Sequence, residues 1–369
     1  MESIVWLLSY LVPFLVVLTV IVFVHEIGHY LVARWTGVAV KTFSIGFGPE
    51  IAGFTDRLGT RWQLSAIPLG GYVRFVGDMN PVSEPDHQAL ADASPATRAH
   101  LFYFKPVWQR IAVVLAGPAA NFLFTFVVLY ALLLGLGRYS VPAIIEQVNP
   151  GSPAATVGIE PGDRVISVDG YEVIGFGDFQ RLIATSPGRQ VTVAVERNGQ
   201  QLQFTTVPDA VEQTDRFGNV NRIGMLGVAR NSSSDDVEFY RPGPLQAVSM
   251  TVSEMLFIVD RTFDFIGDFF VGRGDPEQLG GPVRVAQVSG NIASLGWLAL
   301  LNLTALLSLN IGLFNLFPIP MLDGGHLLYY LIEAARGRPL SRQIQDAGFR
   351  FGLAVVFTLM VFTLVNDLL

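Results

Sequence analysis

An almost uncharged apolar run at residues 4–24 leads without a break into His25-Glu26-Ile27-Gly28-His29. A helix needs about 20 apolar residues to cross the hydrocarbon core of a bilayer, and this run has that length. An ionisable residue at mid-bilayer costs roughly 2.5–3.5 kcal/mol, so such residues usually mark a functional site. The run lacks a basic region before it, and is therefore predicted to be a retained transmembrane helix and not a cleaved signal peptide.

His25 and His29 are four residues apart, so on a helix they project from one face and can bind a single zinc ion. Glu26, beside the first histidine, can then take a proton from zinc-bound water. The alternative interpretation is a buried structural histidine pair. The chain contains no cysteine, so a metal site in it has to use histidine and carboxylate ligands.

The 369-residue chain is 51% hydrophobic and 15% charged, whereas a soluble globular protein has about 25% charged residues. The deficit predicts several helices that are buried or face lipid. The net charge of −7 gives no support for nucleic-acid binding. Further apolar runs at 111–136, 295–317 and 351–364 (extendable to 369) bring the expected number of transmembrane helices to about four.

Polar residues inside these runs are the remaining candidates for a site. Asn121 follows Gly117-Pro118 in the second run, where it is either a contact between helices or a contact to a substrate. Prolines and glycines at 318–325 break the third run at membrane depth, which lipid tolerates only beside protein or a water-filled cavity. Asp323 lies in this break and is the strongest candidate for a third zinc ligand, with His326 as its competitor.

Between the runs the pattern changes. Residues 38–76 alternate with period 2 between glycines and prolines, which indicates β-hairpins. Residues 140–207 carry S-P-A-A at 152–155 and G-D-x-V-x-x-V-x-G at 162–170, and closely resemble a PDZ domain of the bacterial type. Such a domain binds extended peptides at a sheet edge; the alternative is a docking or size-excluding module that binds no peptide. Residues 245–271 predict an amphipathic helix at the membrane surface or against this module.

The expected fold is thus a multi-span α-helical membrane protein with a membrane-associated β-hairpin region and one inserted extracytoplasmic PDZ domain. Lysine and arginine cluster at 34–110 and 336–350, so these loops are expected in the cytoplasm, and both termini and the PDZ domain outside. The predicted segments are the first transmembrane helix (1–37), the β-hairpin region with its loop (38–106), the second transmembrane helix (107–138), the PDZ domain (139–210), a connector with the amphipathic helix (211–294), and the third and fourth transmembrane helices (295–369).

H-E-x-x-H in the first span, G-P-x-x-N at 117–121, N-x-x-P-x-P-x-L-D-G at 315–324 and a PDZ domain together resemble the site-two protease family of intramembrane zinc metalloproteases, and within it the RseP-type bacterial regulators. The resemblance implies one zinc ion held by His25, His29 and Asp323, with Glu26 as catalytic base. It also implies Asn121 and Asn315 beside the active site. The residues from Gly46 to Tyr72 would then guide an extended substrate strand. The best-known members carry two tandem PDZ domains, and this chain has room for one.

The function implied is peptide-bond hydrolysis in or near transmembrane segments of single-span membrane proteins in the bacterial inner membrane. Such substrates are first cut by another protease, as in anti-sigma factor release; remnant signal peptides are a second class. A substrate tail or another peptide is the expected partner of the PDZ domain, and the lipid bilayer surrounds the helices. The main alternative is a non-catalytic PDZ-bearing membrane scaffold with a structural metal site. A transporter predicts an internal repeat, which the two halves of the sequence lack.

Overall fold

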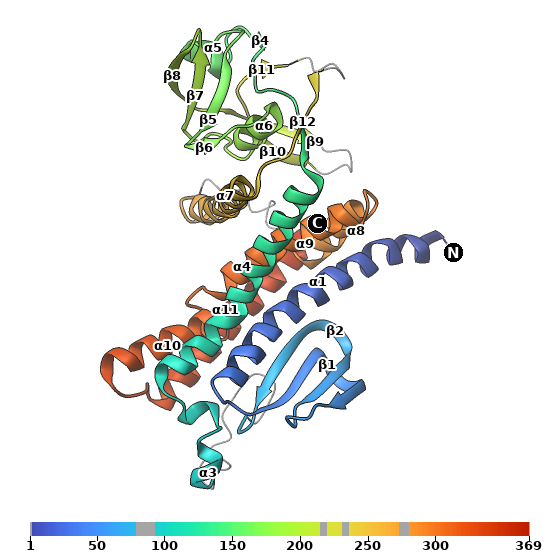
Figure 1. Ribbon diagram of the computed structural model, residues 1–369, viewed down its shortest axis with the longest axis vertical. Coiled ribbons are helices and arrows are strands. Elements are labelled where there is room, and N and C mark those ends of the chain that lie inside the picture. The colour runs from blue at the N-terminus through green and yellow to red at the C-terminus, as the bar shows by residue number, and fades with distance from the viewer. Residues whose placement is uncertain (1, 79–92, 215–219, 231–235, 273–279, 369) are drawn as a thin grey trace. The chain divides into compact units, whose positions relative to one another are not determined.

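A computed structural model of the chain describes residues 2–78, 93–214, 220–230, 236–272 and 280–368. The chain divides into two compact units. The first comprises Met1–Leu129 and Asp275–Leu369, and the second comprises Tyr130–Gly274. Each unit has its own hydrophobic core, and their elements can be followed along the chain by colour in Figure 1.

Four of the described helices are long and apolar enough to cross a membrane. They are α1 (Glu2–Trp35), α4 (Val107–Leu136), α9 (Trp297–Asn315) and α11 (Arg342–Leu368). The four apolar runs of the sequence are therefore confirmed as helices. The last of them begins earlier than its apolar run, because the helix includes the basic residues between Arg342 and Arg350.

Small residues allow α1, α4 and α9 to approach one another closely. A Cβ atom on Gly28 of α1 would lie 2.2 Å from the carbonyl oxygen of Ala116 in α4. On the other side of α4, the Thr125 hydroxyl donates a hydrogen bond to the carbonyl of Ala305 in α9 at 2.8 Å. In a membrane, close backbone packing of this kind replaces the hydrophobic driving force that lipid does not supply. The three helices are thus fixed to one another by contacts that larger side chains would prevent.

β1 (Val40–Thr55) and β2 (Arg61–Phe75) form an antiparallel sheet beside α1, as Figure 1 shows. Both strands bend, and part of each pairs twice, so that Phe43 lies opposite both Val73 and Trp62. Across the sheet the segments follow the order 50–55, 61–65, 40–47 and 67–75. Among the described strands, the last of these segments has a neighbour on one side only. The β-structure predicted for residues 38–76 is therefore present as two long bent strands.

The inner part of this sheet is packed against α1, and its outer part is exposed. The ring of Phe43 stacks on that of Trp62 with 4.3 Å between centroids, and Tyr30 of α1 meets Trp62 at 4.9 Å. Farther out, Ile51 and Phe54 are exposed. Exposed apolar side chains are expected on a segment that contacts lipid, so the outer part of this sheet can lie against the membrane.

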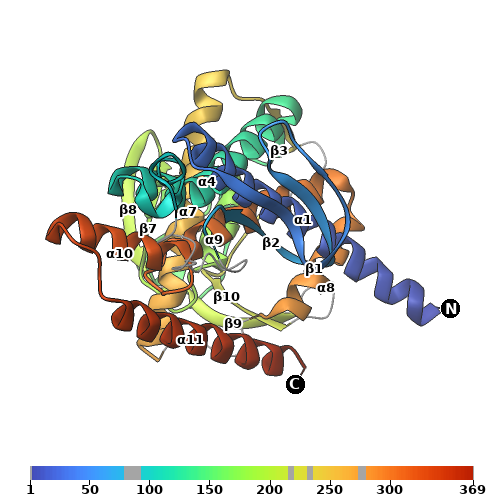
Figure 2. The same cartoon turned by 90° about the horizontal axis from the view of Figure 1, so that it is seen from below.

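The first unit also contains α3 (Pro95–Arg98), η1 (Phe102–Phe104), α8 (Pro282–Ala293) and α10 (Asp323–Arg336). In Figure 2, α8 lies between α1 and the C-terminal end of α11. The Asp367 carboxylate of α11 accepts hydrogen bonds from the backbone N–H groups of Gly281 at 2.7 Å, Val283 at 2.9 Å and Arg284 at 3.1 Å. A carboxylate from a distant helix therefore satisfies the first N–H groups of α8, which otherwise have no partner within the helix.

The second unit is built around a four-stranded sheet in the order β6-β5-β7-β8. Ser152 caps α5 by accepting a hydrogen bond from the Ala155 N–H at 3.3 Å, which explains the S-P-A-A pattern. The other described strands of this unit form two-stranded pairs: β4 with β11, β9 with β10 and β3 with β12. Their bounds are β3 Arg138–Ser140, β4 Gln147–Val148, β5 Arg164–Val168, β6 Tyr171–Glu172, β7 Val191–Arg197, β8 Gln200–Thr206, β9 Asp209–Thr214, β10 Val220–Met225, β11 Val228–Ala229 and β12 Glu238–Tyr240; the helices are α5 Pro153–Val157, α6 Phe176–Ala184 and α7 Pro244–Phe270.

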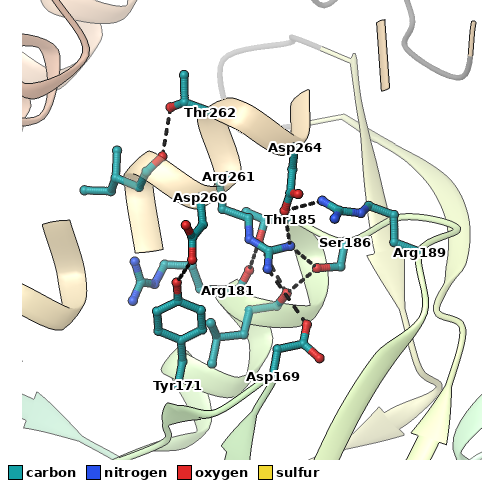
Figure 3. A network of polar contacts seen from close by, with 12 residues as sticks. Asp169, Tyr171, Arg181, Thr185, Ser186, Arg189, Asp260, Arg261, Thr262 and Asp264 are labelled. Carbon is teal, nitrogen blue, oxygen red and sulfur yellow. Dashed lines mark hydrogen bonds and ion pairs between the residues drawn. The ribbon is translucent and has the colours of Figure 1, made fainter. Parts of the chain in front are cut away.

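The amphipathic helix α7 packs its charged face against the sheet and α6 of the second unit, as Figure 3 shows. Arg181 of α6 forms a bidentate pair with Glu254 at 2.5 and 2.8 Å. Phe257 is 4% exposed, and the guanidinium groups of Arg181 and Arg261 both contact its ring. The sequence predicts this helix either at the membrane surface or against the PDZ-like module, and the structure shows it in contact with the module. Its opposite face exposes apolar side chains, among them Val248, Val252, Leu256 and Phe263.

Candidate active site

Three potential metal ligands from two distant helices converge within the first unit. Nε2 of His25 lies 3.1 Å from Oδ2 of Asp323, and Nε2 of His29 lies 3.5 Å from the same oxygen. The two Nε2 atoms are 3.1 Å apart. His25 and His29 are in the C-terminal half of α1, and Asp323 is the first residue of α10. The structure therefore brings Asp323 to two histidines that lie almost 300 positions earlier in the sequence.

These spacings are those of a tetrahedral zinc site. With bonds of 2.0–2.1 Å, the ligand atoms of tetrahedral zinc are about 3.3 Å apart. The three observed distances lie on either side of that value. Oδ2 of Asp323 is buried without a hydrogen-bond partner, and buried polar atoms are rarely left unpaired. Among the described residues, the cluster contains three ligands, which is the number that leaves a fourth position open in catalytic zinc sites.

The other side of each imidazole is held by α4. Nδ1 of His29 lies 2.8 Å from the carbonyl oxygen of Val113, and Nδ1 of His25 lies 3.3 Å from the side-chain amide of Asn121. Asn121 is fully buried. Between these two contacts, α4 presents Gly117, where a Cβ atom would lie 2.3 Å from Nε2 of His29. The glycine of G-P-x-x-N therefore leaves space for the metal-binding edge of the imidazole.

Asp323 is placed by the break between α9 and α10. Met321 has a φ of 105°, which costs free energy for a residue with a side chain. Cβ atoms on Gly324 and Gly325 would come within 2.2 and 2.5 Å of the carbonyl oxygens of Phe317 and Ile319. Because both positions are glycine, α10 can begin directly against the end of α9. This local packing directs the Asp323 carboxylate towards the histidines.

Glu26 lies beside the β-sheet, where β2 runs along α1. The backbone N–H of Val73 approaches its carboxylate. A Cβ atom on Gly71 would lie 3.2 Å from Cγ of Glu26. Gly71 and Val73 belong to the segment 67–75, which pairs with another strand on one side only. A free strand edge next to the carboxylate can pair with an extended peptide.

A cavity of about 570 Å³ adjoins the three ligands and Glu26. His25, Glu26, His29 and Asp323 line it together with Asn315 and His326. Asn315 therefore has access to the cavity, whereas Asn121 contacts His25 from behind. His326, the competing ligand, lines the cavity without belonging to the three-ligand cluster of the described residues.

Sequence reasoning identified Asn121, which contacts His25, but missed the other groups that orient or support the ligands. The Val113 carbonyl is a backbone atom and has no sequence signal. Arg110 and Glu333, which line the far end of the cavity, are paired with each other. The one basic residue of α4 and the one acid of α10 besides Asp323 were the available signals for this pair.

Such a constellation can hydrolyse an amide bond. A three-ligand zinc site with an adjacent carboxylate in a cavity is the arrangement of metal-assisted hydrolysis. The cavity is lined by helices that are apolar enough to span a membrane.

Comparison with known sequences agrees with this geometry. The family model described as peptidase family M50 matches residues 13–359. A protein of Agrobacterium fabrum, provisionally named a zinc metalloprotease, is 46% identical over 364 residues, covering 98% of this chain and 96% of that protein. A protein of Mesorhizobium japonicum with the same kind of name is 48% identical, covering 98% and 99%. Metalloprotease MmpA of Caulobacter vibrioides is 36% identical, covering 97% and 95%.

A solved PDZ domain of an SdrC-like protein from Listeria monocytogenes is similar to a part of the chain at 21% identity, covering 24% of this chain and 84% of that one, with a TM-score of 0.19. The family match extends over nearly the whole chain, from the first spanning helix to the last. The chain therefore belongs to peptidase family M50, the site-two protease family, and is a membrane-bound zinc metalloprotease.

Proposed function

We propose that this metalloprotease hydrolyses peptide bonds in or near the transmembrane segments of single-span membrane proteins. The observation that carries the proposal is the convergence of His25, His29 and Asp323, next to Glu26, in a cavity between apolar helices. A substrate segment inside the bilayer can reach such a site.

His25, His29 and Asp323 would hold one zinc ion per chain. When bound, zinc supplies a Lewis acid that lowers the pKa of water and polarises a carbonyl group. Glu26 lies next to the first ligand and takes the proton of the attacking water. It then passes this proton to the leaving amine, as a general base that becomes a general acid.

Asn121 is assigned the role of orienting His25. A metal-bound imidazole donates its second N–H to an acceptor, which fixes its tautomer and ring orientation. The amide of Asn121 lies at that N–H, and its Oδ1 atom is buried without a hydrogen-bond partner. The oxygen and nitrogen of an amide exchange places by a half-turn of the side chain. In that orientation Oδ1 accepts from Nδ1 of His25, and the buried oxygen is satisfied.

The edge of β2 is the proposed binding site for the opened substrate. A helical substrate must unwind before hydrolysis, because its scissile carbonyl is otherwise hydrogen-bonded within the helix. The segment from Gly71 to Phe75 offers backbone groups next to Glu26. Pairing with this edge would hold an extended strand across the cavity. Asn315, which lines the same cavity, is proposed as a polar contact for that strand.

The proposed location is the bacterial inner membrane. The excess of lysine and arginine at 34–110 and 336–350 favours a cytoplasmic position for these two segments. The second unit and both ends of the chain would then be extracytoplasmic. The second unit, with its PDZ-like sequence, is proposed to bind a substrate tail or another peptide. The proposed substrates are single-span proteins trimmed by another protease, as in anti-sigma factor release, and remnant signal peptides.

Replacement of Glu26 by glutamine tests the proposed mechanism. General acid–base catalysis contributes about 10²–10⁴-fold, so Glu26→Gln should lower the cleavage rate of a reporter transmembrane substrate at least 100-fold. Zinc content, measured on the purified full chain in detergent, should remain that of the wild-type protein. Bound substrates should also accumulate on this variant, and mass spectrometry of the trapped proteins would identify them.

A ligand variant is the matched control. His29→Ala should lose both zinc and cleavage, because two ligands remain of three. A Glu26→Gln variant that cleaves at the wild-type rate would contradict the role of the carboxylate. Full zinc content in His29→Ala would contradict the metal site itself.

A further inference from the structure

A buried ion pair joins α4 to α10 at the far end of the cavity. Nη2 of Arg110 donates to Oε1 of Glu333 at 2.6 Å, and Nη1 donates to Oε2 at 3.0 Å. The side chains are 11% and 13% exposed. Both partners are therefore largely removed from water, and the two parallel hydrogen bonds give the contact a fixed direction.

The Arg110 side chain is constrained by two further contacts. Its Nε donates to the carbonyl oxygen of Lys105 at 3.1 Å. Its guanidinium lies over the ring of Tyr330 at 4.8 Å from the centroid. Tyr330 and Glu333 are three residues apart on α10, so they lie on one face of that helix. Arg110 thus contacts α10 through two neighbouring side chains, while it is itself held by the backbone before α4.

The two helices joined by this pair carry different parts of the proposed metal site. α10 begins with Asp323, ten residues before Glu333. α4 carries Val113, one turn after Arg110, and Asn121, and these two residues hold the imidazoles of His29 and His25. The pair therefore connects the helix of the carboxylate ligand to the helix that orients both histidines.

A small rotation at the pair would be enough to disturb the ligand geometry. Ten helical residues span about 15 Å, so a tilt of α10 by about 10° moves its first residue by roughly 2.6 Å. Ligand distances in zinc sites are maintained within about 0.2 Å. The position of Asp323 is thus sensitive to how α10 is fixed at Glu333.

We propose that Arg110 and Glu333 are positioning residues for the metal site, which set the position of Asp323 relative to the two histidines. The inference rests on the metal site proposed above. A contribution to stability alone does not account for the pair, because buried ion pairs are often replaced by apolar residues without loss of stability. What an apolar pair does not supply is the directional, bidentate contact between the two helices.

The test is the double variant R110M/E333M in the full chain. Methionine is close in length to glutamate and to the aliphatic part of arginine, and the double variant leaves no buried unpaired charge, so it should fold. Its affinity for zinc, measured by competition with a chelator in detergent, should fall about 10-fold, at the lower end of the loss seen when groups that orient metal ligands are removed. Thermal unfolding of the metal-free protein should remain within a few degrees of the wild-type value.

The control is R181M/E254M, which removes a bidentate Arg–Glu pair between two helices of the second unit. This variant should bind zinc with wild-type affinity. The single variant E333Q keeps the shape of the side chain but lacks its charge, and should weaken zinc binding in the same direction as the double variant. It serves as the test if R110M/E333M does not accumulate in membranes.

Wild-type zinc affinity in R110M/E333M, or in E333Q where it stands in for the double variant, would overturn the inference. An equal loss of affinity in R181M/E254M would also overturn it, because the effect would then be general. A His29→Ala variant that retains zinc would instead show that the proposed metal site is wrong. A failure of the positioning role can therefore be distinguished from a failure of the proposed metal site.

Discussion

Gly117 lies so close to His29 that a Cβ atom on it would be 2.3 Å from Nε2 of the imidazole. The metal-binding edge of that ring therefore faces bare backbone of α4. This relationship gives the glycine a specific chemical role, and it leads to the first prediction.

Replacement of Gly117 by alanine should displace the His29 imidazole. The added methyl group occupies space that the ring nitrogen requires, so the zinc affinity should fall at least about 10-fold, in the range observed when ligand orientation is disturbed. Cleavage of a transmembrane reporter should fall with it. Gly135→Ala on the same helix is the control, because a Cβ atom there has no neighbour within 4 Å. Equal zinc affinity in the two variants would contradict the assignment.

Asn121 and Asn315 should differ when each is replaced by alanine. Asn121 contacts Nδ1 of His25, so Asn121→Ala should weaken zinc binding about 10–100-fold, as expected for a group that orients a ligand. Asn315 lines the cavity, so Asn315→Ala should retain zinc and raise the KM of a reporter substrate. Zinc titration and steady-state kinetics on both purified variants check the prediction. The assignment fails if Asn121→Ala binds zinc normally.

Phe257 should be the main apolar anchor of α7 on the second unit. Its side chain is 4% exposed, and truncation of a buried phenylalanine costs about 3–5 kcal/mol. Phe257→Ala should therefore detach α7 and make it sensitive to proteolysis at protease concentrations that leave the wild-type chain intact. Phe263→Ala is the control, since that side chain is 51% exposed. Equal resistance of Phe257→Ala and the wild-type chain would argue against this docking.

The pair between Asp163 and Arg197 should make the second unit sensitive to acid. Burial by itself would raise the pKa of Asp163, but hydrogen bonds from Arg197 at 2.6 Å and from the N–H of Glu160 at 2.9 Å outweigh it and hold the pKa below 3.8. The unfolded chain then binds the proton more readily than the folded chain. The stabilisation is therefore complete above about pH 4 and is lost as the pH falls through the lower pKa of the folded state.

Hydrogen exchange of β5 and β7, followed by mass spectrometry, measures this dependence. Protection in the wild-type chain should decrease steeply as the pH falls below about 4, after correction for the intrinsic exchange rate. Asp163→Asn should have lower protection at neutral pH and a flatter profile. Glu160→Gln is the control, because Glu160 is 62% exposed and an exposed ion pair contributes little. An unchanged profile in Asp163→Asn would exclude this carboxyl as the source.

The spanning helices and the ligand residues could be predicted because their signals are local. Apolar runs of helix length identify α1, α4, α9 and α11, and the spacing of His25 and His29 identifies two ligands. Asp323 could be predicted for a related reason. An acid in a segment broken by prolines and glycines stands out against its apolar surroundings.

Contacts between distant segments had no such signal. The bending of β1 and β2, which lets Phe43 pair with both Val73 and Trp62, depends on how the strands lie against α1 and not on their alternation. The polar composition of residues 209–241 favours loop with a short β addition at 223–228, and it carries no signal for the pairing of β11 with β4 near the start of the module. The pairing of Arg110 with Glu333 joins residues whose helices are adjacent only in the folded unit.

The cap that Asp367 provides to α8 has a consequence for biogenesis. Three backbone N–H groups at Gly281, Val283 and Arg284 depend on a carboxylate that is synthesised more than eighty residues later. A protein folds progressively as the ribosome releases it. The start of α8 must therefore remain without this partner until the final helix has been inserted. A chain that lacks its last few residues would retain the four apolar helices almost in full. It would still lose the hydrogen bonds from the start of α8 to Asp367.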